Sequence, residues 1–174
     1  MEILIQVIGI IAMIVGAISL AQKNTKTVIV IQIISTGLFG IHYFLLGAYA
    51  GAALNILSLL RNLVIRQKHK KWANPKIWYP VTVLAFAVAV FLSGDGLIGI
   101  LPLAGCIFMS TGLYIDDGKI ARRVIVCSSP CWLIYNIANK TIGGVAAEVI
   151  NMCSLIYAFL RYDIKKQNED NLKA

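Results

Sequence analysis

The stretch Arg61-Asn-Leu-Val-Ile-Arg-Gln-Lys-His-Lys-Lys-Trp-Ala-Asn-Pro-Lys76 decides the fold, because this basic segment separates two hydrophobic segments. If seven such hydrophobic segments cross a membrane in turn, fifteen of the sixteen Lys and Arg residues fall on one side, and only Lys140 falls on the other. Short cytoplasmic loops of membrane proteins carry an excess of Lys and Arg. The sequence therefore predicts a multi-pass membrane protein whose N-terminus is outside and whose C-terminal tail is in the cytoplasm.

The composition excludes an ordinary soluble domain. Hydrophobic residues make up 59% of the chain and charged residues 14%, and the mean hydropathy is +0.78, far from the averages of soluble proteins. A net charge of +8 is compatible with binding to nucleic acid, but here the basic residues lie in loops between apolar segments. Membrane topology explains them better. We therefore expect contacts with the lipid bilayer and its anionic headgroups, and no nucleic-acid partner.

Seven segments are long enough to cross a bilayer, since a spanning helix needs about 20 mostly apolar residues. The predicted spans are 3–21, 28–48, 50–66, 77–93, 96–115, 121–138 and 142–161. Tight helical hairpins join the second span to the third and the sixth to the seventh. The predicted fold class is an all-α polytopic membrane protein with seven transmembrane helices.

The spans are predicted to form a 3+1+3 arrangement with two parallel three-helix repeats. At an offset of 90 residues Ile8-Gly-Ile10 aligns with Ile98-Gly-Ile100, and at an offset of 93 Ser35-Thr36 aligns with Ser128-Ser129 and Gly51 with Gly144. Three spans plus one linking span return the second unit to the orientation of the first. The predicted parts are a first unit at 1–67, a basic loop and linking span at 68–94, a second unit at 95–162 and a cytoplasmic tail at 163–174.

Glu148 is the one carboxylate well inside a predicted span. A charged group near the centre of a bilayer is costly, so such residues usually face a cavity or a partner. One interpretation is a proton or cation site, or a hydrogen-bond acceptor for a solute. The alternative is a protonated or paired carboxyl that only holds helices together.

Five further polar residues are candidates for a solute site. Asn55 and Asn151 lie at similar depth in the third and seventh spans. Their amides either bind a polar solute or only form hydrogen bonds that hold the helices together. His42 is either a satisfied core residue or a proton-transfer partner of Glu148. With Tyr135 and Asn136 these residues form a polar set that we expect in the outer half of the bundle, between the third and seventh spans.

Two prolines and several glycines are candidates for structural roles. Pro102 and Pro130 fall inside the fifth and sixth spans, where each frees a carbonyl and bends its helix. With Gly37, which aligns with Pro130, they are candidate hinges, and the alternative is a static kink. Four further glycines are interpreted as positions of close helix packing: Gly9, Gly16, Gly99 and Gly105.

Other chemistry is not indicated. The four cysteines fall within spans without zinc-ligand spacing, so we predict apolar packing and no metal or cofactor. Enzyme signatures such as HExxH, a Walker loop or GxSxG are absent, and the chain is not expected to be an enzyme. Arg61 is expected to extend its guanidinium to the cytoplasmic boundary.

Several strings resemble the YgjV family of bacterial inner-membrane proteins over residues 5 to 162. They are His42-Tyr-Phe-Leu-Leu-Gly-Ala-Tyr49, Leu101-Pro-Leu-Ala-Gly105, Cys131-Trp-Leu-Ile-Tyr-Asn136, Ile142-Gly-Gly144 and Glu148. The resemblance implies a location in the bacterial inner membrane and supplies no substrate. Tyr135 stands where the family pattern has a histidine, which argues against a mechanism that needs a symmetrical pair of histidines.

The family is in turn distantly similar to the MtN3-like superfamily, which includes the SWEET sugar transporters and PQ-loop proteins. That similarity implies a 3+1+3 layout, four hinge prolines and facing Asn residues in the third and seventh spans. This chain matches the layout, has two of the four prolines and lacks a PQ dipeptide, so sugar is not carried over as the solute.

The sequence favours a small-solute transporter that works by alternating access between the two three-helix units, with the solute coupled to a proton or another cation. The rival hypothesis is a non-transporting scaffold or accessory subunit, in which the buried polar residues only stabilise helix packing. The oligomeric state stays open, and a homo-oligomer is one outcome.

Overall fold

The structure is a computed structural model of the chain that describes residues 2–20, 25–67, 70–115 and 118–158. The described residues form α-helices and two short 3-10 helices, with no strand among them. The elements are α1 (Glu2–Leu20), α2 (Thr25–Leu45), α3 (Tyr49–Ile65), η1 (Lys71–Ala73), α4 (Pro75–Ser93), η2 (Gly96–Gly99), α5 (Ile100–Tyr114), α6 (Gly118–Val126), α7 (Ser128–Ala138) and α8 (Ile142–Ala158). The prediction of an all-helical protein is confirmed.

The sixth predicted span is divided into two helices. Helices α6 and α7 meet at Cys127, whose backbone N–H bonds to Val124 O at 3.2 Å instead of continuing the α-helical pattern. Pro130 lacks an N–H and its ring clashes with the carbonyl four residues earlier, which is that of Val126, the last residue of α6. The proline therefore explains the break, and α6 and α7 together make the sixth of seven helical segments.

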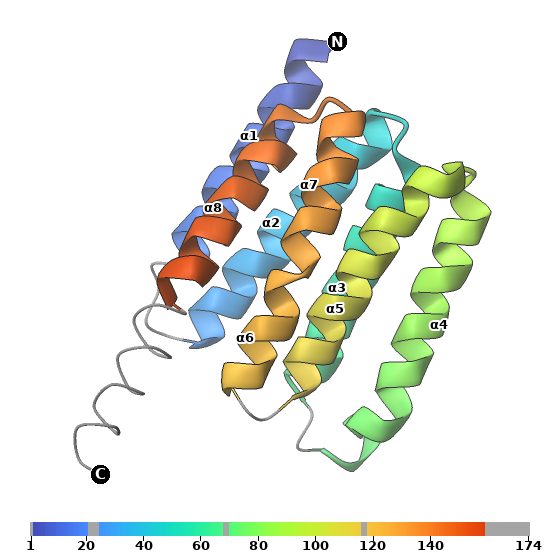
Figure 1. Cartoon of the computed structure of the whole chain (residues 1–174), viewed down its shortest axis with the longest axis vertical. Helices are drawn as coiled ribbons and strands as arrows, with labels where there is room; N and C mark the ends of the chain where they lie inside the picture. Colours follow the sequence, from blue (N-terminus) through green and yellow to red (C-terminus); the bar gives the residue numbers. More distant parts are fainter. Residues whose placement is uncertain (1, 21–24, 68–69, 116–117, 159–174) are drawn as a thin grey trace.

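Consecutive segments run in opposite directions (Figure 1), which places the α3–α4 and α5–α6 connections at one end of the bundle. We call this the basic end, since Arg66, Lys70, Lys71 and Arg123 lie there. The other end, the N-terminal end, holds Glu2 and the α2–α3, α4–α5 and α7–α8 turns. Among the described basic residues only Lys140 lies in a turn at the N-terminal end. The predicted charge asymmetry is thus reproduced in space, while the choice of which end faces the cytoplasm stays a prediction.

The outer surface is apolar. Large apolar side chains are exposed on every described segment, and Phe91, Leu97 and Ile3 are each more than 80% exposed; an apolar surface of this extent indicates contact with lipid or protein. By length and composition Pro75–Ser93 and Gly96–Tyr114 suffice to cross a membrane. Shorter apolar helices run over Glu2–Ile18, Val30–Leu45, Tyr49–Ile65 and Ile142–Ser154. The bundle therefore has the surface of a membrane protein.

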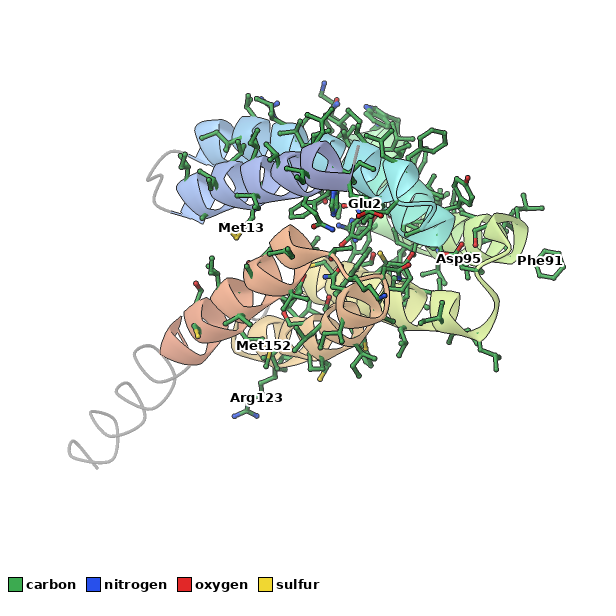
Figure 2. The ribbon with its side chains drawn as sticks, turned by 90° about the horizontal axis from the view of Figure 1, so that it is seen from above. Glu2, Met13, Phe91, Asp95, Arg123 and Met152 are labelled. Atoms are coloured by element: carbon green, nitrogen blue, oxygen red, sulfur yellow. The ribbon has the colours of Figure 1, made fainter. Side chains whose placement is uncertain are left out.

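The helices form two layers (Figure 2). Helix α1 packs on α2 and α2 on α3, while α5 packs on α6 and α7, and α7 packs on α8. The layers contact each other through α1 with α8 and through α3 with α5, and α4 lies against α3 and α5. In Figure 2 they diverge toward the side where Met13 and Met152 are labelled.

The two tight hairpins share one backbone design. In the α2–α3 turn, Leu46 N bonds to His42 O and Ala48 N bonds to Tyr43 O, which is the pattern that closes a helix with a left-handed residue. That residue is Gly47, at φ 77°. The same bonds recur 93 residues later, in the α7–α8 turn. There the left-handed position is occupied by Lys140, at φ 54°, although it favours glycine.

The predicted close-packing glycines are confirmed. A Cβ on Gly9 would lie 2.7 Å from His42 Cε1, one on Gly16 would lie 2.9 Å from Ser35 Oγ, and one on Gly105 would lie 2.6 Å from Trp132 Cδ1. Gly99 lies against Val90 and Ala50. A closer approach joins the two layers, where a Cβ on Gly143 would overlap the backbone of Gly9.

Candidate functional site

A cavity of about 530 Å³ lies between the two layers. Every segment except α4 contributes to its lining. Its polar lining consists of Gln32, Ser35, Thr36, Tyr43, Asn55, Ser58, Arg61, Asn62, Ser128, Ser129, Trp132, Asn136, Glu148, Asn151 and Ser154. This volume and this mixture of apolar walls with convergent polar groups are typical of small-molecule sites.

Four of the six predicted site residues line this cavity: Asn55, Asn136, Glu148 and Asn151. The other two, His42 and Tyr135, are fully buried toward the N-terminal end and are not part of the lining. The cavity also reaches Asn62 in the last turn of α3 and Ser154 in the last two turns of α8. It therefore extends farther toward the basic end than the sequence predicted.

Glu148 and Asn151 lie one helical turn apart on α8, so their side chains share a face. The side chains of Asn151 and of Ser129 on α7 lie next to the Glu148 carboxyl. Within the described residues no basic side chain forms an ion pair with Glu148. Its surroundings are thus those of a carboxyl that accepts hydrogen bonds from neutral groups or from a solute in the cavity.

Asn55 faces the cavity from α3, the opposite wall. Its Nδ2 donates to Gly51 O, one turn earlier, at 2.9 Å. This bond stays within its own helix, so it does not hold α3 to another helix. The Oδ1 atom has lone pairs for a further partner, which is the property expected of a residue that contacts solute.

Toward the N-terminal end, a hydrogen bond between the layers closes the cavity. Tyr43 Oη on α2 donates to Asn136 Oδ1 on α7 at 2.5 Å, and Thr141 Oγ1 donates to the same oxygen at 3.0 Å. All three side chains are buried. Gly144 lies against Asn136 and Thr141, where a Cβ has no room. These buried polar contacts close the cavity toward the N-terminal end of the bundle.

Asp95 reinforces this closed end, in a role that was not predicted from the sequence. Its Oδ2 accepts from Ala50 N at 3.1 Å and from Tyr135 Oη at 2.9 Å, while Tyr135 Oη accepts from Gly51 N at 2.9 Å. Ala50 and Gly51 lie in the first turn of α3, whose N–H groups have no partner inside the helix. A carboxylate is favourable there, and an acidic residue in the two-residue gap between the fourth and fifth spans was the available signal.

Helix α1 supplies the matching contact on the other side. Gln6 Oε1 accepts from Ile142 N, the first residue of α8, at 3.0 Å, and Gln6 Nε2 donates to Lys140 O at 3.0 Å. Each layer therefore provides a side chain that caps the last helix of the other layer. The two contacts hold the layers together at the N-terminal end.

His42 belongs to this closed end and not to the cavity. Its Nδ1 lies 2.8 Å from Ile5 O on α1. Its Nε2 is buried and has no hydrogen-bond partner among the described residues. No hydrogen bond joins His42 to Glu148 there, so the proton-transfer pair stays a prediction.

Arg61 is buried, and the prediction that it reaches the membrane boundary was wrong. Its side chain is 6% exposed and lines the cavity. Nη1 donates to Ser110 Oγ at 2.9 Å, Nε and Nη2 donate to Asn62 Oδ1 at 3.2 and 3.1 Å, and the guanidinium lies 5.9 Å from the centre of the Phe86 ring. These contacts hold the charged group inside the bundle, where α5 supplies an acceptor that the sequence did not reveal.

The candidate hinges occupy three different environments. Pro102 and Pro130 are each the third residue of a helix, α5 and α7. Helix α5 follows η2 without a gap, so Pro102 lies where the chain changes from the 3-10 to the α-helical pattern, whereas Pro130 follows the break at Cys127. Gly37 lies inside α2, with no atom within 4 Å of the position of a Cβ.

Comparison with known proteins places this bundle in a family. The sequence model of the family Imp-YgjV, described as a bacterial inner membrane protein, matches residues 3–166. The chain belongs to the YgjV family of bacterial inner-membrane proteins. It is 28% identical over 151 residues to the inner membrane protein YgjV of Escherichia coli (strain K12), an alignment that covers 83% of this chain and 76% of the relative. No solved structure matches.

Membership of the YgjV family confirms the predicted resemblance and the location in the bacterial inner membrane. The apolar helices and apolar surface described above fit that location. The names of the family and of the relative state no solute or activity, so the interpretation of the cavity rests on its own geometry.

Proposed function

We propose that this protein is a small-solute transporter that works by alternating access between two parallel three-helix units, α1–α3 and α5–α8, linked by α4. The observation that carries the proposal is the cavity between the layers, in which polar side chains from both layers converge between apolar walls and which is closed at the N-terminal end. A bundle whose polar residues served only to lock the helices has no need of a cavity of this volume.

The repeat is supported by contacts that recur at the predicted offsets. The hairpin bond from Ala48 N to Tyr43 O has its counterpart in the bond from Thr141 N to Asn136 O, 93 residues later. Tyr43 and Asn136 are also themselves 93 residues apart, and they bond to each other. Two equivalent residues meet in this way only near the axis that relates two units. A parallel repeat in a transporter has such an axis along the membrane normal.

Contacts between the units repeat as well. Gly9 packs on Gly143, and Gly99 packs on Ala50. Under offsets of 90 for the first helix of each unit and 93 for the others, these two contacts are equivalent. The bond of His42 to Ile5 O is likewise matched by that of Tyr135 to Asp95. Matching interfaces allow the units to rock against each other as rigid bodies, which is the motion that alternating access requires.

In this proposal Asn55, Glu148 and Asn151 contact the solute, and Glu148 is the candidate for coupling to a proton or cation. With the N-terminus outside, the cavity faces the cytoplasm. The contacts of Tyr43, Asn136 and Asp95 then form the outer gate, which has to separate in the other state. Sugar as the solute is not proposed.

The test is flux in proteoliposomes that contain purified protein, across a broad screen of radiolabelled polar solutes. Wild-type protein and Val149→Ala are expected to transport the same solute, because Val149 is 48% exposed on the outer surface of α8. Glu148→Gln, one position earlier, is expected to lower the flux at least tenfold while the protein stays folded. If no solute binds or crosses and Glu148→Gln changes only thermal stability, the scaffold hypothesis replaces the transporter.

A further inference from the structure

Arg61 is a buried cation whose described partners are neutral. Its side chain is 6% exposed, and its three hydrogen bonds go to the oxygens of Ser110 and Asn62. A guanidinium has five N–H donors, so these bonds leave two for another partner. Among the described residues no carboxylate forms an ion pair with it. A buried charge without a counter-charge is strongly unfavourable, so an anion at this position would stabilise the site.

Arg61 lines the cavity, so an anion that balances its charge would bind there. Asn55, Ser58 and Arg61 follow one another at intervals of three residues along α3, which places them on one face, and all three line the cavity. Arg61 lies about 9 Å nearer to the basic end than Asn55, at 1.5 Å of rise per residue. On the opposite wall Glu148 also lines the cavity. The site thus has a cation toward the basic end and a carboxyl farther from that end.

From this arrangement we propose that the cavity binds a small organic acid with a single carboxylate. Arg61 and Asn62 hold the carboxylate, and the uncharged polar part of the molecule reaches Asn55 and Glu148. A guanidinium matches the two oxygens of a carboxylate. The carboxyl of Glu148 in the same cavity disfavours a doubly charged anion such as phosphate. The inference rests on the proposed function, because it names the solute class of the same cavity.

Thermal unfolding of the purified full-length protein in lipid nanodiscs tests the solute class. The probes are lactate and pyruvate, the neutral amides lactamide and pyruvamide, and inorganic phosphate, at constant ionic strength. Lactate or pyruvate is expected to raise the Tm, and the amides and phosphate are expected to leave it unchanged. Equal stabilisation by an amide, stabilisation by phosphate alone, or no stabilisation by either carboxylate overturns the proposal.

Two variants test whether Arg61 binds the carboxylate. Arg61→Gln is expected to raise the Kd for the stabilising carboxylate at least about tenfold, the usual effect of losing a charge-assisted hydrogen bond. Arg66→Gln is the matched control, because Arg66 is an exposed arginine at the end of the same helix. Equal weakening in both variants overturns the assignment. If Arg61→Gln does not fold, Arg61→Lys replaces it, and the wild-type comparison of acid with amide still decides the solute class.

The two proposals fail separately. Carboxylate binding that depends on Arg61 without any flux in proteoliposomes overturns the transporter and leaves this site intact. Flux of a neutral solute that is unchanged by Arg61→Gln overturns the carboxylate site and leaves the transporter intact.

Discussion

The α2–α3 and α7–α8 hairpins have the same backbone hydrogen bonds but different side chains. Gly47 in the first turn corresponds to Lys140 in the second, and Tyr43 corresponds to Asn136. In the helices that follow, Asn55 of α3 corresponds to Glu148 of α8. The matching backbone hydrogen bonds of the two turns are those expected for the proposed repeat. The side chains differ where the cavity and its closed end need different chemistry, so the departures from symmetry mark the candidate functional positions.

The two charged residues that line the cavity in the described part of the chain also differ from the residues at the corresponding positions in the other half. Arg61 on α3 corresponds to Ser154 on α8, and Glu148 on α8 corresponds to Asn55 on α3, at the offset of 93. Each half therefore contributes one charged residue whose counterpart is neutral. A symmetric cavity would present the same groups to both ends of a solute, whereas this one distinguishes them.

The largest expected effect concerns the contact between the layers. Gly143→Ala places a Cβ against the backbone of Gly9, which cannot move aside as a side chain can. We expect a loss of about 3 kcal/mol in the free energy of unfolding. Gly37→Ala is the control, because no atom lies within 4 Å of its Cβ position. The measurement is the melting temperature in detergent, and equal effects in the two variants would show that the contact is loose.

A smaller effect is expected at the two reciprocal caps. Asp95→Ala leaves Ala50 N and Tyr135 Oη without their acceptor, which should lower stability by about 2 kcal/mol. Gln6→Ala removes the cap on α8, where the bond is exposed, and should lower it by less than half as much. Chemical denaturation of both variants gives the two values. A larger loss for Gln6→Ala would reverse the assigned importance of the caps.

The smallest expected effect on stability concerns the left-handed residues of the two turns, Gly47 and Lys140. Lys140→Gly is expected to stabilise the protein by about 1 kcal/mol, since the left-handed conformation strains a residue with a Cβ. Gly47→Ala introduces that strain in the first turn and should destabilise the protein by a similar amount. Thermal unfolding of the two variants side by side gives the signs. If Lys140→Gly destabilises the protein instead, the contacts of the lysine side chain stabilise the fold by more than the strained backbone destabilises it.

Much of the fold was predictable from sequence because lipid imposes strong rules on it. Span length, the positions of Lys and Arg, and the turn at Gly47 follow from local physical requirements, and the structure places helices close to each predicted span. The offset of 93, chosen from short matches such as Gly51 with Gly144, describes the hairpin bonds residue by residue. Local signals of this kind do not depend on which helices become neighbours.

The candidate site was less predictable, because it depends on contacts between helices far apart in the sequence. Arg61 is buried through Ser110, and Asp95 acquires its role from Ala50 and Tyr135, pairings that no spacing in the sequence indicates. The interruption of the sixth span by Pro130 was predicted, but its position at Cys127, between two separate helices, was not. Four cavity residues were found because an amide or carboxyl inside an apolar span needs a polar environment.

The most direct test of the central claim measures whether the closed end opens. Spin labels are placed on the outer surface of α1 and α8 in variants whose only cysteines are the two labelled positions. One pair is at Ile3 and Ile142 near the N-terminal end, and the other is at Ile14 and Cys153 near the basic end; all four positions are exposed. Pulsed dipolar spectroscopy in nanodiscs is expected to give two distances for each pair, with solute shifting the two pairs in opposite directions. A single distance for each pair, unchanged by every solute that binds, would contradict alternating access.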